Sequence, residues 1–279
     1  MTTDNIPTNE LLFSVNTPAM QDRLNLPYYV MAHEVTHEWF GNQLMPAYTA
    51  GSRMLTESIT EYISLKVYEK KFGRKMGLAF LNIQHDRYHN GRRSENEQEY
   101  PLMQVKTEQE YISYGKGAVV FNHLSYLIGE AELNEILRTF LLACKAVPGI
   151  YPTTNAFLQH LKDNVDGALH PLIDELFSEI IWHDFAIEEI QASSERKLDV
   201  IISHQVFGGK NEPVSYPITL AQMDENGVII ATKELVLTQS KTTIPWQLEA
   251  ESTRLVLDPH KLYLDEEWGN NKTERLLSH

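Results

Sequence analysis

The sequence predicts an α+β protein with two domains, a mostly helical domain over residues 1–185 and a small antiparallel β-sandwich over residues 186–279. Apolar residues recur at helical spacing in the first part. After about Trp182 the chain changes to short β-branched segments that are separated by turn residues. The apolar fraction of 42% is typical of globular proteins, and 279 residues are enough for two such domains.

The first domain is expected to begin with a short strand at Glu10–Val15. Pro27 then sets the start of a helix that we expect to end near Gly41, because glycine commonly terminates helices. A second helix follows Ser52, has an apolar residue at every fourth position and ends at Gly73. Further helices are expected at about 75–89, from 114 onward, and at 130–147, 153–165 and 170–181.

The second domain is predicted from its short strands, which alternate with turn residues such as Asp-Glu-Asn-Gly. The strands are expected at 198–207, 216–224, 227–238, 241–248 and 252–258. Their number and spacing are typical of a small antiparallel sandwich. The last residues of the chain are polar, and we expect them to fray as a tail.

The composition limits the partners of the chain. A net charge of −14 opposes binding to nucleic acid or to an anionic membrane, but it tolerates a substrate with a free amine. No apolar run approaches the roughly 18 residues of a membrane-spanning helix. The amino terminus lacks the basic flank and the apolar stretch of a signal peptide. We therefore expect a soluble chain, cytoplasmic by default.

Two histidines stand four residues apart in the stretch His33-Glu34-Val35-Thr36-His37. Residues i and i+4 lie on one face of an α-helix, with Cβ atoms about 5–6 Å apart, so both imidazoles can bind one tetrahedral metal ion. Glu34 is offset around the helix, where its carboxylate can act as general base on a metal-activated water. The pattern alone is a moderate signal, because a helix can carry two histidines by chance.

A catalytic zinc site needs a third protein ligand. Glu57 lies on the second predicted helix, where a carboxylate is uncommon unless it is paired or bound to a metal. We expect Glu57 to complete a site for one Zn²⁺ per chain. Glu61, one turn later, is a candidate to hold the second ring nitrogen of a ligand histidine, with an ordinary ion pair as the open alternative.

Two further sets of residues bear on the site. Tyr114, in the segment "YISYGKGAVV", remains a neutral phenol at working pH and can donate a hydrogen bond to the oxyanion of a tetrahedral intermediate. His85 and His89 also stand four residues apart, but no glutamate follows the first and no third ligand is evident. We interpret this second pair as a solvated helix end in preference to a second metal site.

Together these segments resemble the M1 family of zinc aminopeptidases, gluzincins that include aminopeptidase N. "HEVTHEWFGN" resembles the zinc helix of that family, "MLTESITEYISL" the helix with the third ligand, and "ISYGKGA" the segment whose tyrosine polarises the scissile carbonyl. The resemblance implies a thermolysin-like fold and hydrolysis of amino-terminal peptide bonds by zinc-activated water. It implies that His33, His37 and Glu57 bind zinc, with Glu34 as the base and Tyr114 as the oxyanion donor.

The chain also departs from that family. Its spacing from His37 to Glu57 is one residue longer than usual and resembles a divergent branch that is often fused to permease-like membrane segments, which would tether the parent protein to a membrane. In that branch Glu10, within "IPTNELLFS", takes the place of the glutamate that binds the free α-amine of the substrate. The family's amino-terminal β domain has no counterpart here, so the chain resembles a fragment of a larger protein.

Two other functions remain open. An endopeptidase could use the same zinc site without an anchor for the substrate amine. A metal-bearing accessory or binding module could retain the ligands and turn over weakly, because family membership concerns the ancestral site and does not establish activity.

Overall fold

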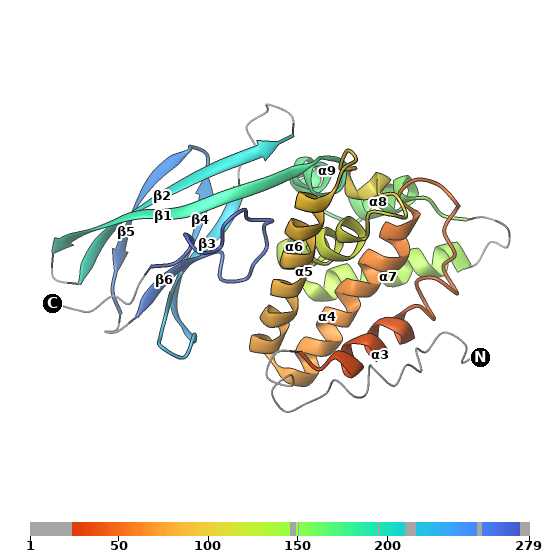
Figure 1. Cartoon of the computed structure of the whole chain (residues 1–279), viewed down its shortest axis with the longest axis horizontal. Coiled ribbons are helices and arrows are strands. Elements are labelled where there is room, and N and C mark those ends of the chain that lie inside the picture. The colour runs from red at the N-terminus through yellow and green to blue at the C-terminus, as the bar shows by residue number, and fades with distance from the viewer. Residues whose placement is uncertain are drawn as a thin grey trace. The chain divides into compact units, whose positions relative to one another are not determined.

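The fold is known from a computed structural model, which describes residues 24–145, 149, 151–194, 196–209, 216–249 and 253–273. The chain forms two compact units, residues 1–180 and 181–279. The first is helical and the second consists of β-strands, so the predicted α+β class is confirmed (Figure 1). The strand expected at Glu10–Val15 lies outside the described residues.

The helical unit is built around α6, in which every residue from Gly117 to Ser125 is buried. The helices α4, α5, α7 and α9 all contact α6, which makes it the centre of the unit. The α-helices are α3 (Leu26–Thr36), α4 (Ile59–Phe72), α5 (Arg74–Ser94), α6 (Gly117–Ile128), α7 (Glu130–Lys145), α8 (Thr154–Asp163) and α9 (His170–Ser178). Two 3₁₀ turns, η2 (Leu102–Gln104) and η4 (Gly167–Leu169), occur between them.

Local sequence signals account for several helix ends. The Asn25 side chain accepts a hydrogen bond from the backbone N–H of Tyr28 and caps α3, with Pro27 in its first turn. Gly73 ends α4 with a φ of 86°, a left-handed conformation that glycine adopts without strain. The prediction that α3 reaches Gly41 was wrong, since the helix ends at Thr36 and residues 37–39 form a turn.

Two π-helical segments interrupt the α-helical pattern, η1 (Met54–Ser58) before α4 and η3 (Tyr111–Lys116) before α6. They lie against one another, and the Ser58 hydroxyl donates to the Ser113 carbonyl at 2.6 Å. Gly117 permits this approach, because a Cβ at that position would lie 2.2 Å from Ser58 Oγ. Single π turns of this kind are frequent at functional sites.

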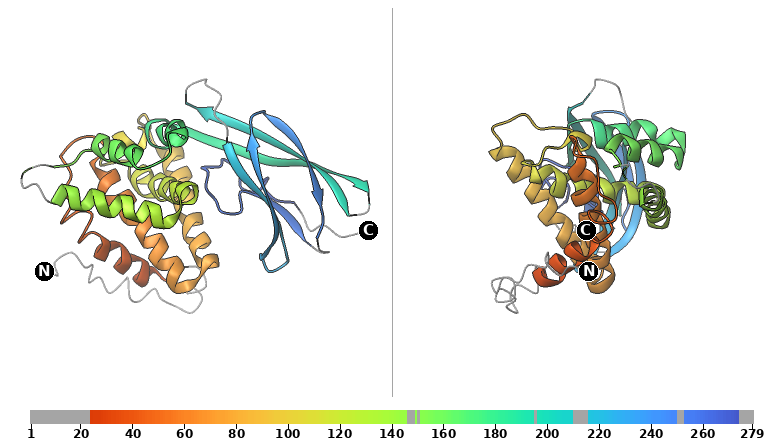
Figure 2. Two further views of the ribbon diagram at one scale, coloured as in Figure 1. Left: turned by 180° about the vertical axis from the view of Figure 1, so that it is seen from behind. Right: turned by 90° about the vertical axis from the view of Figure 1, so that its right-hand side faces the viewer.

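The second unit contains two three-stranded antiparallel sheets (Figures 1 and 2). One has the order β1 (Ile181–Ser194), β2 (Lys197–Gly208), β5 (Lys241–Gln247); the other has β4 (Ile229–Leu237), β3 (Tyr216–Met223), β6 (Arg254–Leu257). Side chains from both sheets, including Phe185, Ile202, Leu220 and Trp246, share one apolar core. The unit is therefore a sandwich.

The sequence analysis missed strand β1, because it extended the preceding helix to residue 181 and began the strands at 198. The structure ends α9 at Ser178 and begins β1 at Ile181. A register shift between Ile187 and Glu189 interrupts the alternation of buried and exposed residues on which strand prediction depends.

None of the helices in the described part of the chain is long and apolar enough to cross a membrane.

Candidate metal centre

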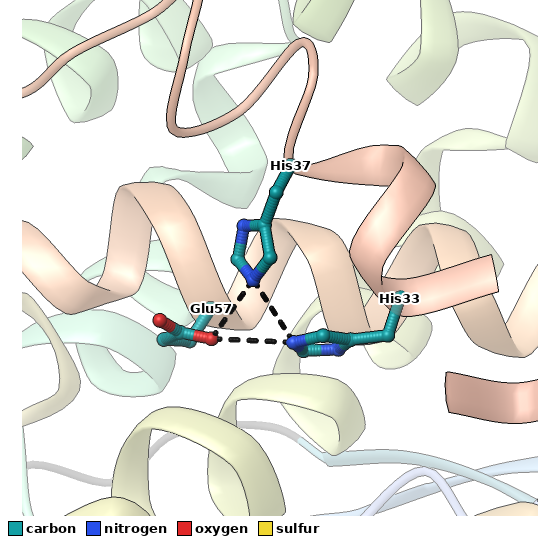
Figure 3. Close-up of side chains that lie close together, drawn as sticks. All are labelled: His33, His37 and Glu57. Atoms are coloured by element: carbon teal, nitrogen blue, oxygen red, sulfur yellow. Dashed lines mark hydrogen bonds and ion pairs between the residues drawn. The ribbon is translucent and has the colours of Figure 1, made fainter. Parts of the chain in front are cut away.

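Helix α3 and the turn that follows it bring two imidazoles together. His33 lies in the last turn of α3 and is buried, and His37 is the C-cap residue of the same helix. Their Nε2 atoms are 3.0 Å apart, so both nitrogens face one point in space (Figure 3). This is the arrangement that the i, i+4 spacing predicts.

The third donor comes from the π turn η1, which directs the Glu57 carboxylate at the two imidazoles (Figure 3). Glu57 Oε2 lies 3.4 Å from His33 Nε2 and 3.4 Å from His37 Nε2. Within the described residues, these three side chains form the one group of three or more His, Cys, Asp or Glu residues that could hold a metal ion.

Nε2 of His33, Nε2 of His37 and Oε2 of Glu57 form a triangle of donor atoms, the donor triangle. Its dimensions fit a tetrahedral metal ion. Zinc binds imidazole and carboxylate at roughly 2.0–2.2 Å, so a tetrahedral ion separates its donor atoms by about 3.3–3.6 Å. The separations here are 3.0, 3.4 and 3.4 Å, and the side chains need little movement to reach that geometry. Two imidazoles and one carboxylate also leave a fourth position for water or substrate, as in catalytic zinc sites.

Each imidazole is oriented through its other ring nitrogen. Glu61 Oε1 lies 3.0 Å from His33 Nδ1, and the Phe40 carbonyl lies 3.0 Å from His37 Nδ1. In the tautomer that carries a proton on Nδ1 and directs it at these oxygens, Nε2 of each ring has the lone pair that a metal requires. The structure thus places Glu61 beside His33, and it places a backbone carbonyl beside His37 that the sequence did not indicate.

The three donor side chains shift one another's pKa values. Burial alone would lower the pKa of His33, but the contacts with Glu57 and Glu61 outweigh burial and raise that pKa to about 9. The pKa of His37 is also raised, because Glu57 and the Phe40 carbonyl outweigh its burial. Burial opposes ionisation of Glu57, yet its contacts with His33, His37 and Tyr114 hold its pKa well below the usual range. Metal binding must therefore displace protons, and its affinity must rise with pH.

The π turn η3 places Tyr114 beside the donor triangle. Its ring is stacked on that of His33, with centroids 5.6 Å apart and 15° between the planes. Arg53 Nη2 donates to the phenol oxygen at 3.4 Å. Burial, and then the negative charge of Glu57, raise the pKa of Tyr114, so the phenol remains a neutral donor over the physiological range. Gly115 lets η3 approach α5, since a Cβ there would lie 2.8 Å from the Gln84 carbonyl oxygen.

The other candidates from the sequence are Glu34, Glu10 and the pair His85 and His89. Glu34 is half-buried on α3, directly after His33, and within the described residues it makes no hydrogen bond or ion pair that would occupy its carboxylate. Glu10 lies outside the described residues. His85 and His89 are buried, at 1% and 9% exposed, so the interpretation of a solvated helix end was wrong.

Sequence reasoning missed three residues that contact the site. Tyr29 and Gln84 both contact Glu61, and Arg53 Nη2 lies 3.8 Å from Glu57 Oε1. Tyr29 and Arg53 could have been found, because each stands four residues before a candidate ligand on the same helical segment. Nothing in the local sequence distinguishes Gln84, which reaches the site only through the packing of α5 against α4.

Comparison with known proteins identifies the family. Residues 4–179 match the peptidase family M1 domain, so the chain belongs to that family. The human protein "endoplasmic reticulum aminopeptidase 2" is 27% identical over 137 residues, which are 47% of this chain and 14% of that protein.

The solved structures that match parts of the chain include the following two. The Legionella pneumophila aminopeptidase A structure, a complex with aspartic acid, has a TM-score of 0.48 and 18% identity over 80% of this chain and 24% of that one. An M1 zinc metallopeptidase from Deinococcus radiodurans has a TM-score of 0.43 and 22% identity over 54% of this chain and 32% of that one. The aligned region is in every case less than a third of the relative's length.

Proposed function

We propose that the chain is the catalytic domain of a zinc aminopeptidase, which hydrolyses peptide bonds next to a free amino terminus. The observation that carries the proposal is the donor triangle of His33, His37 and Glu57, whose separations suit one tetrahedral zinc ion. Membership of peptidase family M1 supports the same reaction class. When bound, zinc supplies a Lewis acid that lowers the pKa of water to about 7.

The residues around the donor triangle have separate roles in proton transfer, oxyanion stabilisation, orientation of a ligand histidine and binding of the substrate amine. Glu34 accepts a proton from the attacking water and delivers it to the leaving amine, a role that suits a half-buried carboxylate next to a ligand. The Tyr114 hydroxyl donates a hydrogen bond to the oxyanion of the tetrahedral intermediate. Glu61 holds His33 in the tautomer that leaves Nε2 available. Glu10 anchors the free α-amine of the substrate; this assignment rests on the sequence resemblance.

The base is tested by replacing Glu34 with Gln. The variant keeps the size of the side chain but cannot accept a proton, so kcat should fall by about 10²- to 10⁴-fold while zinc content stays that of the wild type. The assay is release of an amino-terminal residue from a peptide, and zinc is measured by elemental analysis. Wild-type turnover in the Glu34→Gln protein would rule out this mechanism.

The preference for a free amine separates the aminopeptidase from an endopeptidase on the same site. We expect peptides with a free amino terminus to be cleaved and their amino-acetylated counterparts to resist cleavage. Replacement of Glu10 with Gln should raise KM for the free peptides and leave zinc content unchanged. Equal cleavage of both peptide sets would favour the endopeptidase, and zinc binding without cleavage of either set would favour the accessory module.

A further inference from the structure

Glu61 is a fully buried carboxylate with contacts to three side chains. Its Oε1 accepts a hydrogen bond from the Tyr29 hydroxyl at 2.5 Å and lies 3.0 Å from His33 Nδ1. Its Oε2 accepts a hydrogen bond from Gln84 Nε2 at 2.8 Å. Both oxygens are thus engaged, and the carboxylate can rotate only by losing at least one of these contacts.

The partners come from three separate helices. Tyr29 and His33 stand one turn apart on α3, Glu61 lies in the first turn of α4, and Gln84 lies on α5. A buried carboxylate is costly unless hydrogen bonds compensate the loss of water. The orientation of the Gln84 amide follows from this contact, because the reversed amide would bring two acceptor oxygens together.

The two ligand histidines are therefore supported in different ways. His37 is held by the Phe40 carbonyl, three residues away in its own turn. His33 is held by Glu61, and Glu61 is held in turn by Tyr29 and Gln84. The support of His33 thus depends on tertiary packing among α3, α4 and α5, whereas that of His37 is local.

We propose that Tyr29 and Gln84 are positioning residues that fix Glu61 against His33 and thereby set the affinity of the site for a divalent metal ion. The inference rests on the proposed zinc site and deepens it. A carboxylate that contacts a metal-binding histidine orients the ring and increases its basicity, and loss of such a contact typically lowers metal affinity 10- to 100-fold. The Tyr29 ring also packs edge-on against the His33 ring, with centroids 6.2 Å apart, and Tyr29→Phe keeps that contact. The Tyr29 hydroxyl and the Gln84 amide contact Glu61, so these groups act on His33 through Glu61.

The test compares zinc affinities by competition with a chelator of known affinity, in the full chain. Gln84→Leu removes the donor to Oε2, and Tyr29→Phe removes only the hydroxyl that donates to Oε1. We expect the zinc Kd to rise by about 10- to 100-fold in Gln84→Leu and by about tenfold in Tyr29→Phe. The visible spectrum of the Co²⁺-loaded Tyr29→Phe protein should also shift, because the orientation of the His33 ring changes.

Two matched controls separate this role from a general effect on folding. Tyr62→Phe removes a buried tyrosine hydroxyl on α4, which donates to Ser125 Oγ at 3.2 Å. Gln222→Leu removes a fully buried amide of β3, which donates to Thr253 Oγ1 at 3.0 Å. Both controls should lose thermal stability and keep the wild-type zinc Kd.

The outcomes are distinct. A wild-type Kd in a folded Tyr29→Phe protein would overturn the inference and leave the zinc site intact, and so would an equal loss of affinity in the Tyr62→Phe control. If Gln84→Leu fails to fold, Tyr29→Phe decides the question alone. A wild-type chain that binds no zinc would instead contradict the proposed function, and the inference would fall with it.

Discussion

Two clusters of buried ionisable groups, one in each unit of the chain, behave in opposite ways. In the helical unit, His33, Glu57 and Glu61 meet at one place, and their mutual contacts hold the pKa of Glu57 low and raise that of His33 to about 9. In the β unit, burial dominates and raises the pKa of Asp258 to about 7 and that of Asp265 to about 6. The cluster at His33 and Glu57 therefore preserves charge in the interior, whereas burial favours the neutral forms of Asp258 and Asp265, as it does for His123 in the helical unit.

This difference indicates where function resides. A protein interior keeps buried charges only when partners compensate them, and such clusters occur preferentially at functional sites. In the β unit, by contrast, Asp258 accepts backbone hydrogen bonds from Leu262 and Tyr263 and so shapes a turn. We therefore expect substitutions in the helical unit to change activity and metal affinity, and those in the β unit to change stability alone.

The largest effect beyond loss of the general base is expected from Tyr114→Phe. The variant retains the ring that stacks on His33 and loses the donor to the oxyanion, so kcat should fall by about 10²- to 10³-fold. KM and zinc content should change little, because the hydroxyl acts mainly in the transition state. Steady-state kinetics with a free peptide give both constants, and an increase in KM alone would show that Tyr114 only binds substrate.

A smaller effect is expected where the two π turns meet. Gly117→Ala places a Cβ 2.2 Å from Ser58 Oγ, so the segments that carry Glu57 and Tyr114 must separate. Overpacking of this kind costs about 1–3 kcal/mol of stability, and here it should also weaken zinc binding. Gly129→Ala is the control; its φ of 93° makes it strained as well, but a Cβ there meets nothing within 4 Å. If both variants lose stability and neither loses zinc affinity, the contact between the π turns does not position the site.

The smallest effect concerns the pH dependence of the β unit. In the folded chain Asp258 has a pKa of about 7, above its unfolded value near 4, so the folded state retains a proton that the unfolded state releases. Its contribution to stability is present below about pH 4 and is lost as the pH rises to 7, by at most about 1.4 kcal/mol per pH unit. Asp258→Asn should reduce this slope, as measured by hydrogen exchange of amides in residues 254–265. An unchanged slope would assign the pH dependence to other groups.

The sequence predicted much of the site because helical periodicity places His33 and His37 on one face, whatever the tertiary fold. Glu57 could be identified because it is a carboxylate in an apolar helical pattern. The π turns that aim Glu57 and Tyr114 were not predicted, because both segments were read as ordinary α-helix from their apolar spacing. Gln84 was missed because its role arises only from contact between α5 and α4. Strand β1 was missed because its bulge breaks the alternation.

The measurement that tests the central claim most directly is zinc content by elemental analysis, for the wild type and Glu57→Ala purified side by side without added metal. The account predicts about one zinc per wild-type chain and a large loss in the variant, because His33 and His37 alone leave a catalytic zinc site one ligand short. A wild-type chain that is free of zinc and fails to take up added zinc would contradict it. Full zinc occupancy in the Glu57→Ala protein would contradict the assignment of Glu57 as the third ligand.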